Sequence, residues 1–136
     1  MTLTNLKVAI VLSILSGTTL VQAKCLDSVD QLKANKVKAR WQETTANDGK
    51  PLKIAIADGP SGLVYSAKKA GVLWLTGNIS VCLSGGAREI TLKNTKATSN
   101  VPFFARAAMP SKQAAEIVND QIRLRGGGWD GTFIGL

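Results

Sequence analysis

The clearest pattern of hydrophobic and polar positions lies between residues 71 and 83, where the two kinds of residue alternate with a period of two. Apart from glycine, one side of the alternation carries aliphatic residues alone: Leu73, Leu75, Ile79, Val81 and Leu83. Because successive side chains of a strand point to opposite faces, this pattern predicts a β-strand with one buried face. Gly77 interrupts the pattern, and we expect a bulge, a bend or a close backbone contact there. We interpret this stretch as the central strand of a small β protein.

Shorter strands are predicted on both sides of this element. Apolar and polar positions alternate again over residues 37–42, 52–57, 63–68, 88–93, 101–106 and 129–136. Turn-forming residues separate these stretches, most clearly at 47–49 and 58–62. Residues 111–119 fit a helix or a strand and continue into a strand-like pattern at 122–125. Residues 26–34 favour one or two helical turns, with Asp27 or Ser28 as the cap, or else a tight loop.

About eight strands joined by short turns favour an all-β fold. Long amphipathic helices are missing from the pattern, which argues against a parallel α/β sheet. Sequential hairpins favour an up-and-down order, and closing that order into a barrel removes the exposed strand edges. We therefore predict a small antiparallel β-barrel, with a two-sheet β-sandwich as the alternative.

The first 23 residues have the pattern of a secretory signal peptide. Lys7 precedes a short apolar run, and the stretch ends in Val21-Gln22-Ala23, which fits a cleavage site. The apolar run is too short to span a bilayer. A lipoprotein signal would need a small residue directly before Cys25, where Lys24 stands. We expect cleavage after Ala23 and a single β domain over residues 24–136, in the periplasm or secreted.

The chain has two cysteines, Cys25 and Cys82. In an exported domain two cysteines indicate one disulfide. That bond would join the start of the mature chain to the central strand. The alternative is a pair of buried free thiols.

The residue inventory excludes much chemistry. Because the chain has no histidine, nucleophilic catalysis with a histidine base and histidine metal sites are excluded. Two cysteines alone do not complete a zinc site. A carboxylate pair could cleave glycosides, and the candidates are Glu43, Glu89 and Glu116, but Glu43 and Glu89 look like ordinary solvated charges. We therefore expect no enzyme, no metal and no cofactor.

The charge is strongly positive, with 17 Lys and Arg against 9 Asp and Glu and a formal net charge of +8. The excess is spread along the chain, which fits either a solvated surface or attraction to anionic envelope material. We do not expect a nucleic acid partner. Arginines at predicted strand ends would form a cationic rim: Arg40, Arg88, Arg106, Arg123 and Arg125. Arg123 and Arg125 share one strand face, so this pair is the most plausible contact for an anion.

The few large aromatic residues are candidates for core packing or for lining a ligand cavity. The candidates for binding among them are Trp41, Tyr65, Trp74 and Trp129. Trp41 in the first strand, the eight-strand count and the closing Gly-Gly-Trp-Asp-Gly-Thr-Phe are similar to the lipocalin and calycin barrels. Ala39 stands where those barrels have a glycine two residues before the first-strand Trp. The resemblance therefore implies architecture, and no ligand or residue role follows from it.

Two functions fit these observations. The first is a monomeric, non-enzymatic exported protein that binds a small apolar or anionic envelope ligand in the barrel mouth. The second is a secreted or periplasmic inhibitor or accessory protein that docks on a protein partner, on a membrane surface or on the cell wall through a basic face. A cavity in the barrel favours the first, whereas a filled core with an exposed aromatic patch favours the second.

Overall fold

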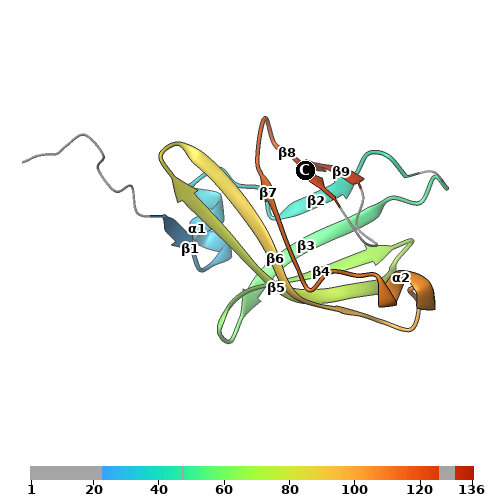
Figure 1. Cartoon of the computed structure of the whole chain (residues 1–136). Coiled ribbons are helices and arrows are strands. Elements are labelled where there is room, and N and C mark those ends of the chain that lie inside the picture. The colour runs from blue at the N-terminus through green and yellow to red at the C-terminus, as the bar shows by residue number, and fades with distance from the viewer. Residues whose placement is uncertain (1–22, 47, 126–130) are drawn as a thin grey trace, which may run out of the picture.

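The computed structural model describes residues 23–46, 48–125 and 131–136, and these residues form one barrel-shaped antiparallel sheet with two short helices (Figure 1). The elements in chain order are β1 (Lys24–Leu26), α1 (Val29–Ala34), β2 (Arg40–Glu43), β3 (Leu52–Gly59), β4 (Gly62–Lys69), β5 (Val72–Ser84), β6 (Ala87–Ala97), α2 (Phe103–Ala107), β7 (Lys112–Glu116), β8 (Gln121–Leu124) and β9 (Gly131–Gly135). Their pairing order is β7-β6-β5-β4-β3-β2-β9-β8, and β1 pairs with β5 beside this path. The predicted antiparallel β-barrel is confirmed.

A tight turn joins β7 and β8, the first and last strands of this pairing order. Val118 pairs with Gln121 across Asn119 and Asp120, which both have positive φ of 53° and 56°. Two such residues make the kind of turn whose twist suits a hairpin. Further along, the side-chain Nε2 of Gln113 in β7 donates a hydrogen bond to the carbonyl of Arg125 after β8. A side chain thus links β7 to the end of β8, and the barrel is nearly closed.

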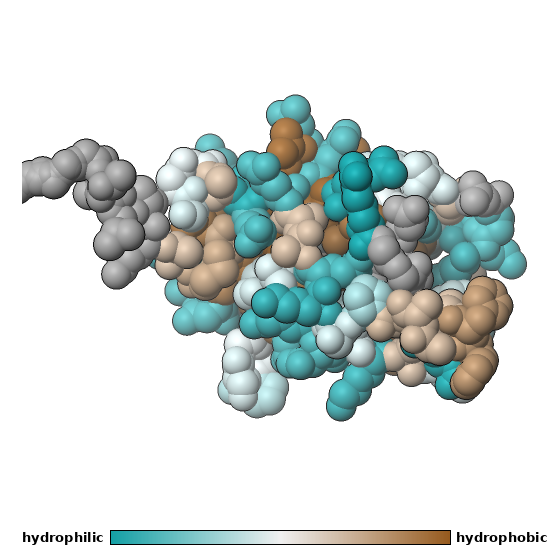
Figure 2. Space-filling view, viewed as in Figure 1, coloured by the Kyte–Doolittle hydropathy of each residue, from teal (hydrophilic) through white to brown (hydrophobic). Residues whose placement is uncertain are grey.

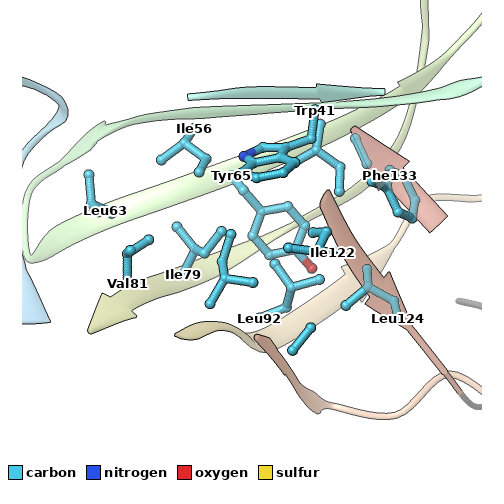
Figure 3. Close-up of a cluster of buried hydrophobic side chains, with 14 of the residues drawn as sticks. Trp41, Ile56, Leu63, Tyr65, Ile79, Val81, Leu92, Ile122, Leu124 and Phe133 are labelled. Carbon is cyan, nitrogen blue, oxygen red and sulfur yellow. The ribbon is translucent and has the colours of Figure 1, made fainter. Parts of the chain in front are cut away.

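The barrel interior is filled with side chains (Figure 3). Trp41, Leu92, Ile122, Leu124 and Phe133 are each at most 1 % exposed and come from four different strands. Burying large aliphatic and aromatic side chains is the main favourable term in folding. Buried positions alternate with more accessible ones along β4 and β8, as the sequence pattern predicts, and the interior of the barrel is the hydrophobic core.

The long strand β5 confirms the predicted central element, and the expected irregularity at Gly77 is present, with the extra residue in β6. The register between β5 and β6 shifts between Thr76 and Asn78, and Asn94 of β6 has φ of 53° at this point. A second register shift lies where β4 meets β5, between Ala67 and Lys68. There Leu75 and Leu73 pair with successive residues of β4, so Trp74 has no partner in that ladder. The sequence pattern did not indicate this second irregularity.

The predicted disulfide is also confirmed. Cys25 and Cys82 are direct partners in the β1–β5 ladder, with Cα atoms 3.9 Å apart and sulfur atoms 2.00 Å apart. The predicted short helix is present as α1, where the Ser28 hydroxyl oxygen accepts a hydrogen bond from the Gln31 amide at 3.2 Å. The ambiguous stretch 111–119 is mostly strand, as β7.

The prediction of a strand at residues 101–106 is wrong, because α2 occupies most of this stretch. Pro102 precedes the first helical residue, where its fixed φ is tolerated, and its carbonyl accepts the amide hydrogen bond of Arg106 at 2.9 Å. The alternating pattern failed here because neither phenylalanine of the stretch is buried.

Within residues 23–46, 48–125 and 131–136, no helix has the length and apolar character needed to cross a membrane. Residues 1–22 of the proposed leader (residues 1–23) and Trp129 lie outside the described residues.

Candidate functional site

The outer face of the sheet carries a row of five directly paired residues that crosses five strands. The row runs from β2 to β6 as Arg40, Ala55, Ser66, Thr76 and Lys96. Its two ends are long cations and its middle consists of small side chains. Neighbouring strands are about 4.8 Å apart, so the row is roughly 19 Å long. Because the middle residues barely rise above the backbone, the row forms the floor of a groove.

Two adjoining hollows follow this row. One has a volume of about 600 Å³ and the other about 700 Å³, and both are lined by Ala55 and Ser66. The first extends toward Lys50, Lys53 and Lys68, and the second toward Asn78, Asn94 and Lys96. We call this combined surface the outer groove, defined by the five residues of the row together with Lys50, Lys53, Lys68, Asn78 and Asn94.

The charge in the outer groove is of one sign. Five of its residues are Lys or Arg, and no Asp or Glu side chain is among the described residues that line either hollow. Lys53 and Lys68 are direct partners across β3 and β4. Like charges directly opposite each other destabilise a sheet. An anion between these two ammonium groups would remove that repulsion.

The bulge at Gly77 shapes the second hollow. Opposite Gly77 the β6 strand carries one extra residue, and the Asn94 side-chain Nδ2 donates to Asn78 Oδ1 at 2.8 Å on the outer face. The two amide side chains are thereby held together at the groove wall. Inside the barrel, the Tyr65 ring packs against Gly77. A Cβ at residue 77 would lie only 2.7 Å from Tyr65 Cε1, so a larger residue would clash with the ring.

A cation–aromatic cluster borders the groove at the end of β4. Lys69 Nζ lies 2.7 Å from Asp48 Oδ2 and 5.1 Å from the centroid of the Trp74 ring. The hydrogen bond from Lys69 lowers the pKa of the Asp48 carboxyl below its ordinary value, with a further contribution from the Lys50 amide. Asp48 therefore stays ionised and its negative charge is paired with Lys69. The charges of Lys50 and Lys68 are not balanced by this carboxylate at this end of the groove.

The residues proposed from the sequence do not come together in one place. Trp41 and Tyr65 are core residues, at 0 % and 2 % exposure, and the Trp41 indole Nε1 donates to the Lys38 carbonyl at 3.0 Å. Trp74 is half-buried beside Lys69. Arg123 and Arg125 are both exposed and follow the predicted alternation of β8, but β9 separates β8 from β2 and therefore from the outer groove.

Sequence reasoning named Arg40 as part of a cationic rim but missed Lys53, Lys68 and Lys96. The available signal was the run of small residues at outward positions of three strands, Ala55, Ser66 and Thr76. Which of these face one another depends on the register between strands, and no pattern within a single strand specifies that register.

The described residues contain no group of three or more Asp, Glu or Cys side chains that could hold a metal ion. The chain matches no protein-family model, and comparison with curated proteins and with solved structures finds no significant match. The chemistry of the outer groove is therefore the basis for a functional proposal.

Proposed function

We propose that this protein is a non-enzymatic exported binding protein that holds an extended anionic ligand of the cell envelope in the outer groove. The main observation behind this proposal is the Lys53–Lys68 pair, which lies directly beside the floor of small residues. No Asp or Glu is among the described residues that line this hollow. Cations around a shallow floor suit a ligand whose negative charges are distributed along a chain. The filled barrel core argues against a ligand in the barrel mouth, the position expected from the sequence, and supports placing the ligand on the outer face of the sheet.

The proposed ligand class follows from the dimensions of the groove. The groove is roughly 19 Å long, by the spacing of five strands, and it has cations at both ends and along one side. A phosphorylated or carboxylated glycan would place several anionic groups against these cations at once. The Ser66 hydroxyl and the amide side chains of Asn78 and Asn94 provide hydrogen-bonding groups along the floor and wall.

A suitable binding test uses a fluorescein-labelled sulfated hexasaccharide as a model linear polyanion, with a neutral dextran of similar length for comparison. The double substitution K53S/K68S should weaken binding of the polyanion by about tenfold, since exposed ion pairs contribute up to about 1 kcal/mol each. It should leave the free energy of unfolding equal or higher, because it removes a like-charge pair.

The matched control is K24S/K33S, which removes the same charge near β1 and α1. This control should bind the polyanion almost as well as the original protein. Equal losses in both double variants would show that net charge alone governs binding, and the outer groove would then be rejected as the site.

Export is the second half of the proposal. It is supported by the signal-like pattern of residues 1–23 and by the Cys25–Cys82 disulfide, which is typical of oxidising compartments. Expression of the full chain in a bacterial host should give a protein whose mass corresponds to a start at Lys24. A protein that retains its leader, or that carries a lipid on Cys25, contradicts this.

A further inference from the structure

The helix α2 presents its largest apolar side chains to solvent. Phe103 is 75 % exposed and Phe104 is 77 % exposed, the two highest values among the large hydrophobic residues that the structure describes as exposed. Figure 2 shows a brown projection at the end of the molecule where α2 lies in Figure 1. Neither phenylalanine lines the hollows of the outer groove.

The fold holds α2 in this orientation. Val101 is buried, and Ala105 and Met109 pack against the hydrophobic core, so every fourth residue of the segment faces inward. Before the helix, the Thr98 hydroxyl and the Asn100 amide both donate to the Leu73 carbonyl, at 2.8 and 3.1 Å. The anchoring residues are thus mostly smaller than the exposed ones. This arrangement reverses the usual hydrophobic pattern, and exposed apolar groups of this kind mark interaction sites.

The charge at the same end of the barrel is strongly positive. At this end, which we call the α2 end, β2, β4, β6 and β8 finish and β3, β5, β7 and β9 begin. The described cations here are Lys50, Lys53, Lys68, Lys69, Lys93, Lys96, Arg106, Lys112 and Arg125. The described carboxylates are Glu43, which accepts the Leu52 amide, and Asp48, which pairs with Lys69.

The opposite end is balanced. The six other described carboxylates lie there, on β1–α1, on the strand ends and in the turn before β8: Asp27, Asp30, Asp58, Glu89, Glu116 and Asp120. The pairing of β6 with β7 shows the contrast directly. Glu89 faces Glu116 toward the far end, whereas Lys93 faces Lys112 toward the α2 end.

We propose that the α2 end docks on an anionic lipid bilayer, with Phe103 and Phe104 inserted at the interface and the surrounding cations on lipid phosphates. Two phenylalanine rings provide at most about 500 Å² of contact, whereas a stable protein interface needs about 800 Å² per partner. This contact area is sufficient for binding to a bilayer, because the two rings need only to enter its interfacial layer. Arg106 lies 5.6 Å from the Phe103 ring centroid, so a cation accompanies the ring to the level of the headgroups.

The test is co-sedimentation with vesicles of phosphatidylglycerol and phosphatidylcholine mixed equally, and with vesicles of phosphatidylcholine alone. The protein should bind the anionic vesicles, and binding should decrease as salt rises because the charges are screened. The double substitution F103S/F104S should lower partition by about a hundredfold or more, since it removes both large apolar side chains from the interface. The matched control V118S removes a 54 % exposed apolar residue at the opposite end and should leave partition unchanged.

Insertion is tested separately by the variant F104W with brominated lipids. The added fluorescence of this Trp should be quenched in anionic vesicles, whereas that of V118W should not. Failure of the protein to bind anionic vesicles overturns the proposal, and so does unchanged partition of F103S/F104S. A dimer in solution that F103S/F104S abolishes would assign the phenylalanines to a second copy of the chain and also overturns it. Because the outer groove is tested with a soluble polyanion, the two proposals can fail independently.

Discussion

Tyr65 and Gly77 are direct partners across β4 and β5, and the tyrosine ring occupies the space that a side chain at residue 77 would need. A Cβ on Gly77 would lie 2.7 Å from Tyr65 Cε1 and 2.7 Å from the Lys93 carbonyl oxygen. The glycine is therefore required by a close approach of ring and backbone. This relationship connects the bulge, the core and the wall of the outer groove.

The first prediction concerns this contact. Gly77→Ala should lower the free energy of unfolding by about 1 to 3 kcal/mol, the usual cost of overpacking a core. The backbone carbonyl cannot move aside as easily as a side chain, so relaxation will be incomplete. Urea unfolding followed by Trp fluorescence measures the change. Thr76→Ala, at the neighbouring outward position, serves as the control, and a cost for Gly77→Ala no larger than that of the control contradicts the close approach.

The second prediction concerns ionisation of Tyr65, the one tyrosine of the chain. Burial raises the pKa of Tyr65 above its ordinary value of about 10, and the hydrogen bond with the Thr95 hydroxyl, at 2.6 Å, lowers the pKa in part. Absorbance at 295 nm should therefore titrate above pH 10 in the folded protein. Thr95→Val should move the titration to still higher pH, and a midpoint at or below 10 in the original protein is the result that contradicts this.

The same shift predicts how stability depends on pH. Below about pH 10 the tyrosine is neutral in both the folded and the unfolded chain, so the contribution of its burial is fully present. Above that pH the unfolded chain loses the proton while the folded chain keeps it, and stability falls as pH rises. Denaturant unfolding at pH 9 and pH 11 should show this loss, and Tyr65→Phe should reduce the part of the loss that comes from this residue.

The sequence was sufficient for features that depend on one strand at a time. The alternation in residues 71–83 predicted β5, and Gly77 predicted an irregularity in its pairing, because both signals are local. The pairing of Cys25 with Cys82 followed from there being only two cysteines. Trp41, by contrast, was compatible with a core or a binding role until its partners were known.

Features that depend on several elements together were not accessible. The 101–106 stretch has an apolar pattern typical of a strand, yet Phe103 and Phe104 face solvent because only Val101, Ala105 and Met109 reach the core. The outer groove needed the register of five strands. Trp129, proposed from the sequence for binding, stays a prediction.

The third prediction separates the two arginines that the sequence places on one strand face. Arg125 lies at the α2 end, whereas Arg123 pairs with Thr132 within the β8–β9 ladder, further from that end. Arg125→Ser should weaken partition into anionic vesicles about fivefold, since a cation near an anionic surface contributes about 1 kcal/mol. Arg123→Ser should have a clearly smaller effect. Vesicle co-sedimentation at low salt measures both, and equal effects would falsify docking by the α2 end in favour of the whole basic face.

The fourth prediction concerns the disulfide. Replacing both Cys25 and Cys82 by Ser should lower the free energy of unfolding by about 4 kcal/mol, the chain-entropy value for a loop of 57 residues. Unfolding of the reduced original protein should show a similar loss. Peptide mapping without reductant should recover the two cysteine peptides linked, and free reaction of both thiols with an alkylating reagent in the unreduced protein would be the contrary result.

The single disulfide also determines how oxidative folding can go wrong. A chain with four cysteines has three ways to pair them all, whereas this chain has one. Scrambling within a molecule is therefore impossible, and no isomerase is needed to correct the pairing. The remaining error is a bond between two molecules, whose frequency rises with protein concentration. Oxidative refolding of this protein at high dilution should accordingly proceed without shuffled monomers, and covalent dimers should be the side product that dilution suppresses.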